Sequence, residues 1–271
     1  MEIIEEKVIN QNNWKKYFNF QKYNVLSWIH FIVLIISGVS PLISLAAALA
    51  TVIETKNFLL IWFTNYDTFT YQSNLLISLY IWLSFWKTDL KMFKTHTLLM
   101  TLMVYIFVTF TFFNSYDLMR SVGKIPQKED IINSNPNNLI DIDNLFVACS
   151  TWNHIINPIF FILYGSFSLA KENKPFMDNV YKYITVGMIY PLIYTLYLIL
   201  IPWSGYLDNG ANSYSVYGVF SQTKYNNLTW LWIPPLLAVF PISLTIIWNI
   251  KFHICKKETN TIKDKKIINP T

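Results

Sequence analysis

The fold is decided by a run of residues that reads SWIHFIVLIISGVSPLISLAAALATVI, from Ser27 to Ile53. This run holds no Asp, Glu, Lys or Arg. An α-helix needs about 20 apolar residues to cross the hydrocarbon core of a bilayer. The run follows a more polar stretch and is too long for the apolar part of a cleaved signal peptide. It therefore predicts a transmembrane helix that stays in the mature protein.

Five further apolar runs of similar length follow along the chain. They cover residues 69–86, 97–114, 145–169, 183–203 and 228–250, and a shorter piece, 58–63, predicts an interfacial turn or an early start of the second run. Of the 271 residues, 53% are apolar and 14% charged, whereas soluble domains carry about 25% charged residues. The sequence predicts an all-α polytopic membrane protein, a bundle of six transmembrane helices in the cell membrane.

The basic residues predict the orientation of these helices. Sixteen of the 21 Lys and Arg residues fall in segments 1–26, 87–96, 170–182 and 251–271, and five fall in 54–68, 115–144 and 204–227. Short cytoplasmic loops carry the excess of Lys and Arg. We therefore expect both termini in the cytoplasm and the loops 54–68, 115–144 and 204–227 outside the cell.

The same pattern predicts the division of the chain and its partners. Residues 1–26 form a cytoplasmic segment, 27–250 the transmembrane domain, and 251–271 a basic, disordered cytoplasmic tail. The net charge of +5 is explained by basic loops that face anionic lipid. Membrane lipids are thus the expected partners, and nucleic acid is not. Cys149 lies in an apolar run and Cys255 in the tail, so no disulfide framework is indicated.

Any function must then reside in polar groups inside the bundle, which are costly in hydrocarbon. His154 lies about nine residues into the fourth run. At 100° per residue it shares a helix face with Ser150 and Asn157, so this face is expected to point inward. Pro158 leaves the carbonyl of His154 without its helical partner and predicts a kink there.

The second run carries a matching polar face, formed by Asp67, Thr70, Asn74 and Ser78. A Thr hydroxyl becomes a nucleophile when a neutral His within hydrogen-bond reach takes its proton. Asn74, Gln72 or a tyrosine of the bundle could then stabilise the oxyanion. The fifth run adds a row of aromatic residues on one face, which are Tyr183, Tyr190, Tyr194 and Tyr197.

Each of these residues also has a purely structural interpretation. A Thr near the start of a span often caps the helix or bonds back to a carbonyl. An intramembrane His can form a hydrogen bond between helices. A row of tyrosines can pack against neighbouring helices and anchor the helix at the membrane interface. His154 has no second His, Cys or carboxylate at ligand spacing on its helix, so we expect neither a metal nor a cofactor.

Four short segments resemble a known family in order and spacing. They are FTYQSNLL (69–76), NHIINP (153–158), YPLIYTLY (190–197) and SVYGVF (215–220). The chain resembles the six-helix androgen-induced and androgen-dependent membrane proteins, which hydrolyse fatty acid esters of hydroxy fatty acids, and their uncharacterised bacterial relatives. The resemblance implies that Thr70 matches the family's nucleophile and His154 its catalytic His.

These observations together predict an intramembrane hydrolase of lipid esters. Thr70 and His154 are its expected catalytic residues, a lipid ester is its expected substrate, and Asn74, Asn157, Tyr190 and Tyr194 are expected to bind that substrate. The alternative is a non-enzymatic protein, either a small transporter or channel or a lipid-binding accessory factor, that uses the same polar core to hold its ligand.

Overall fold

The computed structural model describes residues 25–86, 89–121, 142–172, 174–205 and 214–268. These residues form six rods of helix. The rods are α2 (Val25–Thr55), α3 (Phe69–Trp86), α4 (Thr97–Ser121), a composite of α5 (Ile142–Thr151), the π-helical turn η3 (Trp152–Ile156) and α6 (Asn157–Lys171), then α7 (Val180–Leu200) and α8 (Thr229–Ile268). Short helical turns lie between them at η1 (Trp62–Tyr66), η2 (Lys91–Phe93), η4 (Ile201–Ser204) and η5 (Gly218–Phe220). The predicted all-α fold is confirmed for this part of the chain.

Each predicted apolar run overlaps one of the six rods, and the run 69–86 coincides with α3. The run 183–203 continues from α7 into η4, and the run 228–250 begins one residue before α8. Five rods are long and apolar enough to cross a membrane. Helix α3 is the one left out of these five, because Thr70, Gln72 and Asn74 lower its mean hydropathy. The chain is thus a multi-pass membrane protein with at least five candidate spans.

Two details of the connections differ from or refine the predictions. The expected disordered tail from residue 251 is wrong for most of its length, because α8 continues to Ile268. Lys and Glu residues of the segment 251–268 favour a helix, and this segment contains no Pro. The apolar piece 58–63 forms a turn that leads into η1. Residues 1–24 of the predicted cytoplasmic segment lie outside the described residues.

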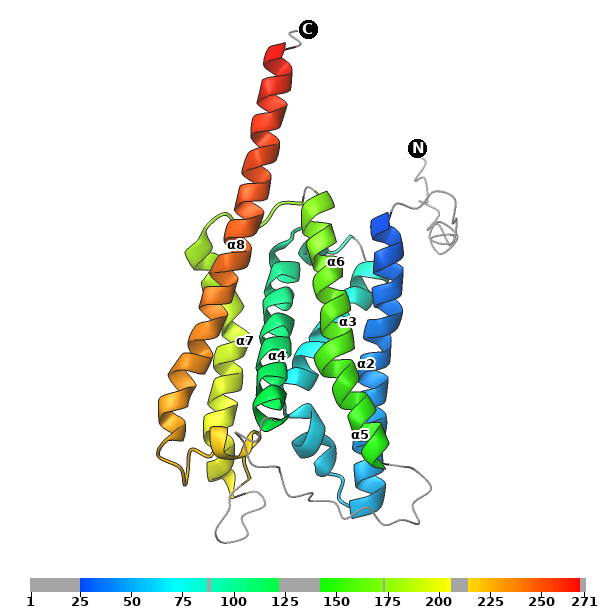
Figure 1. Ribbon diagram of the computed structural model, residues 1–271, viewed down its shortest axis with the longest axis vertical. Coiled ribbons are helices and arrows are strands. Elements are labelled where there is room, and N and C mark those ends of the chain that lie inside the picture. The colour runs from blue at the N-terminus through cyan, green and yellow to red at the C-terminus, as the bar shows by residue number, and fades with distance from the viewer. Residues whose placement is uncertain (1–24, 87–88, 122–141, 173, 206–213, 269–271) are drawn as a thin grey trace, which may run out of the picture.

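The rods alternate in direction, so α2 begins and α8 ends at the same end of the bundle (Figure 1). We call this end, where Val25 lies, the proximal end, and the opposite end, where α3 begins at Phe69, the distal end. Helix α4 stands in the middle and packs against α3, α6 and α8, while α2 packs against α3, α5 and α6. Helix α7 packs against α8 on the other side of α4.

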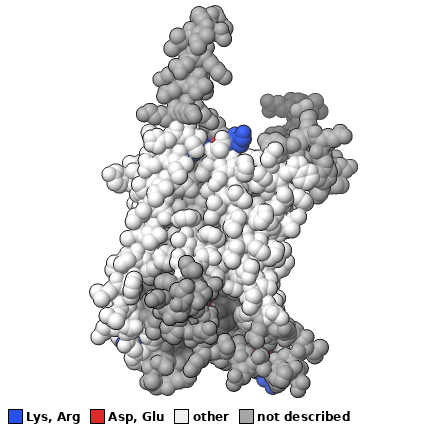
Figure 2. All heavy atoms as spheres, viewed as in Figure 1, with Lys and Arg blue, Asp and Glu red and all other residues white. Residues whose placement is uncertain are grey.

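The outer surface of the bundle is apolar. Large side chains such as Leu42, Ile193 and Leu231 are more than 60% exposed. On the face shown in Figure 2, the Lys and Arg atoms of the described residues gather at the two ends and leave a band without them between. A soluble protein would not leave so broad an apolar surface in water. The band matches the hydrocarbon layer of a bilayer.

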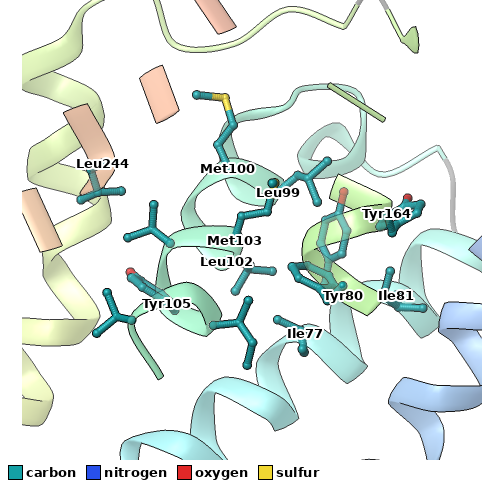
Figure 3. Packing of buried hydrophobic residues seen from close by; sticks show 14 of the residues in the cluster. Ile77, Tyr80, Ile81, Leu99, Met100, Leu102, Met103, Tyr105, Tyr164 and Leu244 are labelled. Carbon is teal, nitrogen blue, oxygen red and sulfur yellow. The ribbon is translucent and has the colours of Figure 1, made fainter. Parts of the chain in front are cut away.

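The apolar core lies around α4. Met100 and Ile106 are fully buried there, and Leu244 of α8 packs on the same cluster (Figure 3). Ile77 and Ile81 of α3 close it from the other side. This packing fixes α4 between α3 and α6 on one side and α8 on the other. It thereby sets the position of the distal end of α4.

Candidate functional site

A network of hydrogen bonds between short polar side chains joins α2, α3 and the π-helical turn. Its centre is Asn153, which is fully buried. The Asn153 side-chain oxygen accepts from the Ser40 hydroxyl at 2.5 Å, and its amide donates to the Ser44 hydroxyl at 2.9 Å and to Cys149 Sγ at 3.3 Å. One asparagine thereby ties its own rod to α2 through two serines.

Asn74 and Asn157 extend this network to α3. The Asn157 amide donates to the Asn74 side-chain oxygen at 2.7 Å and its own oxygen accepts from the Ser37 hydroxyl at 2.8 Å. The Asn74 amide donates to the backbone carbonyl oxygens of Thr70 and Asn153, at 2.8 Å each. Two predicted substrate-binding residues are therefore brought together, with both of their side chains engaged in hydrogen bonds between helices.

The π-helical turn η3 has a clear cause in the sequence. Pro158 has no N–H, so the carbonyl of His154 cannot form its ordinary helical hydrogen bond. The chain instead closes a wider turn in which the Asn157 N–H donates to the Trp152 carbonyl, five residues earlier. Such single π turns within α-helices often occur at functional sites. The extra residue also rotates the helix, so a projection at 100° per residue fails across it.

His154 sits within this turn and faces α4. Its ring stacks on that of Phe113, with the centroids 3.4 Å apart and the planes at 16°. His154 Nδ1 lies 2.9 Å from the Ser150 carbonyl oxygen and 3.3 Å from the Ser150 hydroxyl. A carbonyl oxygen only accepts, so Nδ1 carries the hydrogen and the neutral ring keeps its lone pair on Nε2. Orientation of a His by a backbone carbonyl is typical of a positioned base.

Thr70 lies in the first turn of α3 and is 9% exposed. It does not cap the helix, because that role belongs to Thr68, whose hydroxyl accepts from the Tyr71 N–H at 3.4 Å. Within the described residues, the Thr70 hydroxyl makes no hydrogen bond and only its carbonyl oxygen is used, by Ser73 and Asn74. The capping and back-bonding interpretations of Thr70 are therefore wrong for this structure.

Two independent contacts place Thr70 and His154 at a similar depth in the distal half. The shared Asn74 amide holds the carbonyl oxygens of Thr70 and Asn153 within twice its 2.8 Å bond length of each other. Asn153 is the residue before His154. The backbones that carry the two predicted catalytic residues are therefore close neighbours.

The second contact runs through α4. The Thr109 hydroxyl lies 3.0 Å from the Ser73 hydroxyl of α3. One turn further toward the distal end, Phe113 stacks on His154, and one turn in the same direction along α3 leads from Ser73 to Thr70. No hydrogen bond joins Thr70 to His154 among the described residues, so their pairing in catalysis stays a prediction.

The tyrosines of α7 meet the start of α3. The Tyr190 hydroxyl donates to the Gln72 side-chain oxygen at 2.8 Å, and its ring stacks on Phe69 at 5.2 Å. The Tyr194 hydroxyl donates to the Asp67 carbonyl at 2.9 Å and lies 3.1 Å from the Tyr217 hydroxyl. These two predicted residues therefore lie beside the turn that carries Thr70.

Sequence reasoning missed three parts of this site. It overlooked Asn153, although Asn153 and Asn157 are four residues apart. It also overlooked Ser37, Ser40 and Ser44 of α2, whose spacing of three and four residues places them on one helix face and could have found them. Phe113 carries no distinguishing sequence signal, because a phenylalanine in an apolar span is ordinary.

A cluster of charged side chains, which includes Lys251, Glu172 and Lys174, lies at the proximal end of the bundle. Lys251 of α8 is 1% exposed and donates to the carbonyls of Leu169 and Glu172 at 3.0 and 3.4 Å. The Glu172 carboxylate accepts from Ser168 at 2.5 Å and pairs with Lys174 at 3.0 Å. Burial opposes ionisation of Glu172, yet the hydrogen bonds from its neighbours lower its pKa from 4.5 to about 2. Burial also lowers the pKa of the adjacent His96.

Searches for similar proteins found relatives without an assigned activity. A family described as "Protein of unknown function (DUF1600)" matches residues 147–258. "Uncharacterized protein MG133" of Mycoplasma genitalium is 35% identical over 233 residues, which cover 78% of this chain and 84% of that protein. "Uncharacterized protein MG452" of the same organism is 30% identical over 194 residues, covering 70% and 69%. Its homologue in Mycoplasma pneumoniae is 26% identical over 198 residues, covering 70% and 72%.

No solved structure matches the chain. The matches confirm the expectation of uncharacterised relatives, while the link to the androgen-induced proteins stays a prediction. Among the described residues, no group of three or more His, Cys, Asp or Glu side chains could hold a metal ion.

Proposed function

Because this chain belongs to the DUF1600 family of proteins of unknown function, we propose its activity from its own geometry: hydrolysis of a lipid ester within the membrane. Thr70 is the nucleophile and His154 the general base. The observation that carries the proposal is a contrast within one small region. The side chains of Asn74, Asn153 and Asn157 are engaged in hydrogen bonds, whereas the Thr70 hydroxyl and His154 Nε2 are not, within the described residues.

The reaction divides into two balanced steps. Thr70 Oγ attacks the ester carbonyl carbon while His154 Nε2 takes the hydroxyl proton, and the alcohol leaves with that proton. Water then attacks the acyl-Thr70 ester with His154 again acting as base, which releases the fatty acid and restores Thr70. Ser150 keeps the hydrogen on Nδ1 throughout, so Nε2 presents its lone pair at the start of each step.

The surroundings support a lipid as substrate. Thr70 and His154 are 9% and 8% exposed, and the outer surface of the helices around them is apolar, with Leu75 and Ile155 more than a third exposed. An acyl chain can approach from such a surface at little cost in free energy, because hydrocarbon replaces hydrocarbon. The polar ester would then be the part that reaches the buried hydroxyl.

The test compares two catalytic variants with two matched controls in lipid nanodiscs. Thr70→Ala and His154→Ala should each lower the turnover of a long-chain p-nitrophenyl ester at least about 100-fold, because each removes one member of a unit. A fluorophosphonate should label the wild type at Thr70. Thr51→Ala removes a buried hydroxyl that bonds back to Ala47, and His30→Ala removes an intramembrane His that bonds Ser84. Both controls should retain turnover.

The competing class is a transporter, channel or lipid-binding accessory protein. It predicts lipid binding by the wild type without acylation of Thr70 and without ester turnover in any variant. Equal loss of activity and of folding in Thr70→Ala would assign Thr70 a structural role instead. Either result would replace the hydrolase proposal.

We also propose that the proximal end faces the cytoplasm, with both termini inside and the site in the external half of the bundle. The division of sixteen basic residues against five supports this orientation. Single cysteines introduced at 57 and 226 should react with a membrane-impermeant maleimide in intact cells, and one at 94 should react only after permeabilisation. The reverse pattern would invert the orientation.

A further inference from the structure

The segment Tyr214–Ser221 folds over the start of α3. The Tyr214 hydroxyl donates to the Phe63 carbonyl and to the Asp67 carboxylate. The Ser221 hydroxyl closes the segment on itself by accepting from the Tyr217 N–H at 3.0 Å. Gly218 has φ +56°, a left-handed conformation that favours glycine. The Tyr217 hydroxyl reaches the start of α3.

The Tyr217 hydroxyl is held as an acceptor. It accepts from the Phe69 N–H, the first of α3, at 2.9 Å and lies 3.1 Å from the Tyr194 hydroxyl. The Tyr217 side chain is 39% exposed, and a phenol keeps its hydrogen at neutral pH because its ordinary pKa is about 10.

The next residue after Phe69 is Thr70. Its N–H belongs to the first turn of α3, where the backbone N–H groups lack helical partners. Among the described residues, neither the N–H nor the hydroxyl of Thr70 makes a hydrogen bond. A phenolic hydrogen, a backbone N–H and a free nucleophile therefore lie at adjacent positions, at the helix end that favours negative charge.

We infer that Tyr217 is a further catalytic residue of the proposed hydrolase: its hydroxyl, together with the Thr70 N–H, binds the ester carbonyl oxygen and stabilises the oxyanion. This inference rests on the proposed function. When Thr70 Oγ bonds to the carbonyl carbon, the π electrons move to the carbonyl oxygen, and Tyr217 donates a hydrogen bond to that charge without transferring its proton. The charge returns to the carbon–oxygen bond as the alcohol leaves.

The position also explains why Asn74 does not serve this purpose. Both amide hydrogens of Asn74 are used by backbone carbonyls, and the Gln72 amide donates to the Tyr66 carbonyl at 2.9 Å. Of the groups that the sequence suggested for an oxyanion site, a tyrosine therefore fits best, and Tyr217 is the tyrosine whose hydroxyl contacts the first N–H of α3.

The experiment compares Tyr217→Phe with Tyr197→Phe in lipid nanodiscs. Tyr197 is a neighbouring tyrosine whose hydroxyl accepts from the Trp62 indole at 3.3 Å, so its loss should leave kcat unchanged. Tyr217→Phe should lower kcat about 100- to 1,000-fold with little change in KM, the range found on removal of one oxyanion donor. Its affinity for an alkyl boronic acid, which forms a tetrahedral adduct on Thr70, should fall by a similar factor.

A second variant separates catalysis from folding. Replacement of Tyr217 by 3-fluorotyrosine keeps the hydroxyl and should restore kcat to within about tenfold of the wild type. A wild-type protein that forms no adduct and hydrolyses no ester overturns the proposed function and this inference with it. An active wild type whose Tyr217→Phe variant matches Tyr197→Phe in kcat overturns this inference alone.

Discussion

The two sides of α4 are held together by different physical means. On the side of α2, α3 and the π-helical turn, the contacts are hydrogen bonds between short polar side chains centred on Asn153. On the side of α7 and α8, they are close apolar packing and aromatic rings. Gly187 of α7 lies against Leu244 of α8, and the Tyr105 hydroxyl of α4 donates to the Gly187 carbonyl at 2.7 Å.

The difference follows from the solvent. Lipid is as apolar as a leucine side chain, so burying leucine against leucine in a bilayer gains little, and helices associate through close packing and hydrogen bonds. The α7–α8 side uses a glycine to bring two backbones together. The α2–α3 side uses polar groups, which also brings the Thr70 and Asn153 carbonyls to one amide. The polar side is therefore the one able to hold a site.

The largest expected effect is on the polar side. Asn153→Leu strands the hydroxyls of Ser40 and Ser44 and adds bulk in a filled space, so it should lower the free energy of unfolding by about 3 kcal/mol. Unfolding in detergent by increasing sodium dodecyl sulfate measures this. Asn249→Leu is the control, since Asn249 is exposed and its amide donates to the Thr245 carbonyl of its own helix, and it should change stability by less than about 0.5 kcal/mol. Equal effects of the two variants would show that the network contributes no special stability.

A substitution on the α7–α8 side should lower the free energy of unfolding by less than Asn153→Leu does, and a second substitution should restore part of the loss. A Cβ at Gly187 would lie 2.8 Å from both methyl groups of Leu244. Gly187→Ala should therefore cost about 1 to 2 kcal/mol of unfolding free energy. In the double variant with Leu244→Ala, the loss should be smaller than the sum of the single losses, because the clash is removed. Additive losses would contradict the packing contact.

The proximal end should depend on pH through Glu172. Its pKa falls from 4.5 to about 2 on folding, so its stabilising contribution is full above about pH 4.5 and is lost as the pH falls toward 2. Because its side chain is 31% exposed, we expect a loss of about 1 to 2 kcal/mol. Unfolding curves at pH 6 and pH 3 measure it. Glu172→Gln should remove most of this difference, and an unchanged pH dependence would contradict the assignment.

The smallest expected effect is loss of one hydroxyl from the polar network. Ser40→Ala removes a single donor to Asn153, and hydrogen bonds between membrane helices are worth about 0.6 kcal/mol on average. The same detergent unfolding measures it against Thr195→Ala, whose hydroxyl bonds back within its own helix. A loss as large as that of Asn153→Leu would mean that the serines, and not the asparagine, organise the network.

The sequence predicted the helices better than it predicted the faces they present. The run 69–86 coincides with α3 because hydrophobicity and the flanking polar residues act locally. The face of the fourth rod could not be projected in the same way, because Pro158 induces the π-helical turn and rotates Asn153 toward α2 while His154 turns to Phe113. The projection at 100° per residue fails here because Pro158 lacks the N–H that an α-helix requires.

The candidate site shows the same division. Thr70 and His154 were singled out because polar groups are costly in hydrocarbon, and both are buried in the distal half. The predicted roles of Asn74 and Asn157 were harder to assign, because each amide's partner is on another helix. Tyr217 could not be placed at all, since it meets Phe69 across 148 positions of the chain.

The sequence by itself determined that this protein lies in a membrane as long helices, because apolar length and the distribution of charge act on each segment separately. Only the tertiary structure decided which polar atoms are satisfied and which remain available. Hydrogen bonds are directional and short, so the rotation of one helix by a single residue decides whether an asparagine binds its neighbour or a histidine nitrogen stays open. That choice depends on all the neighbouring helices at once.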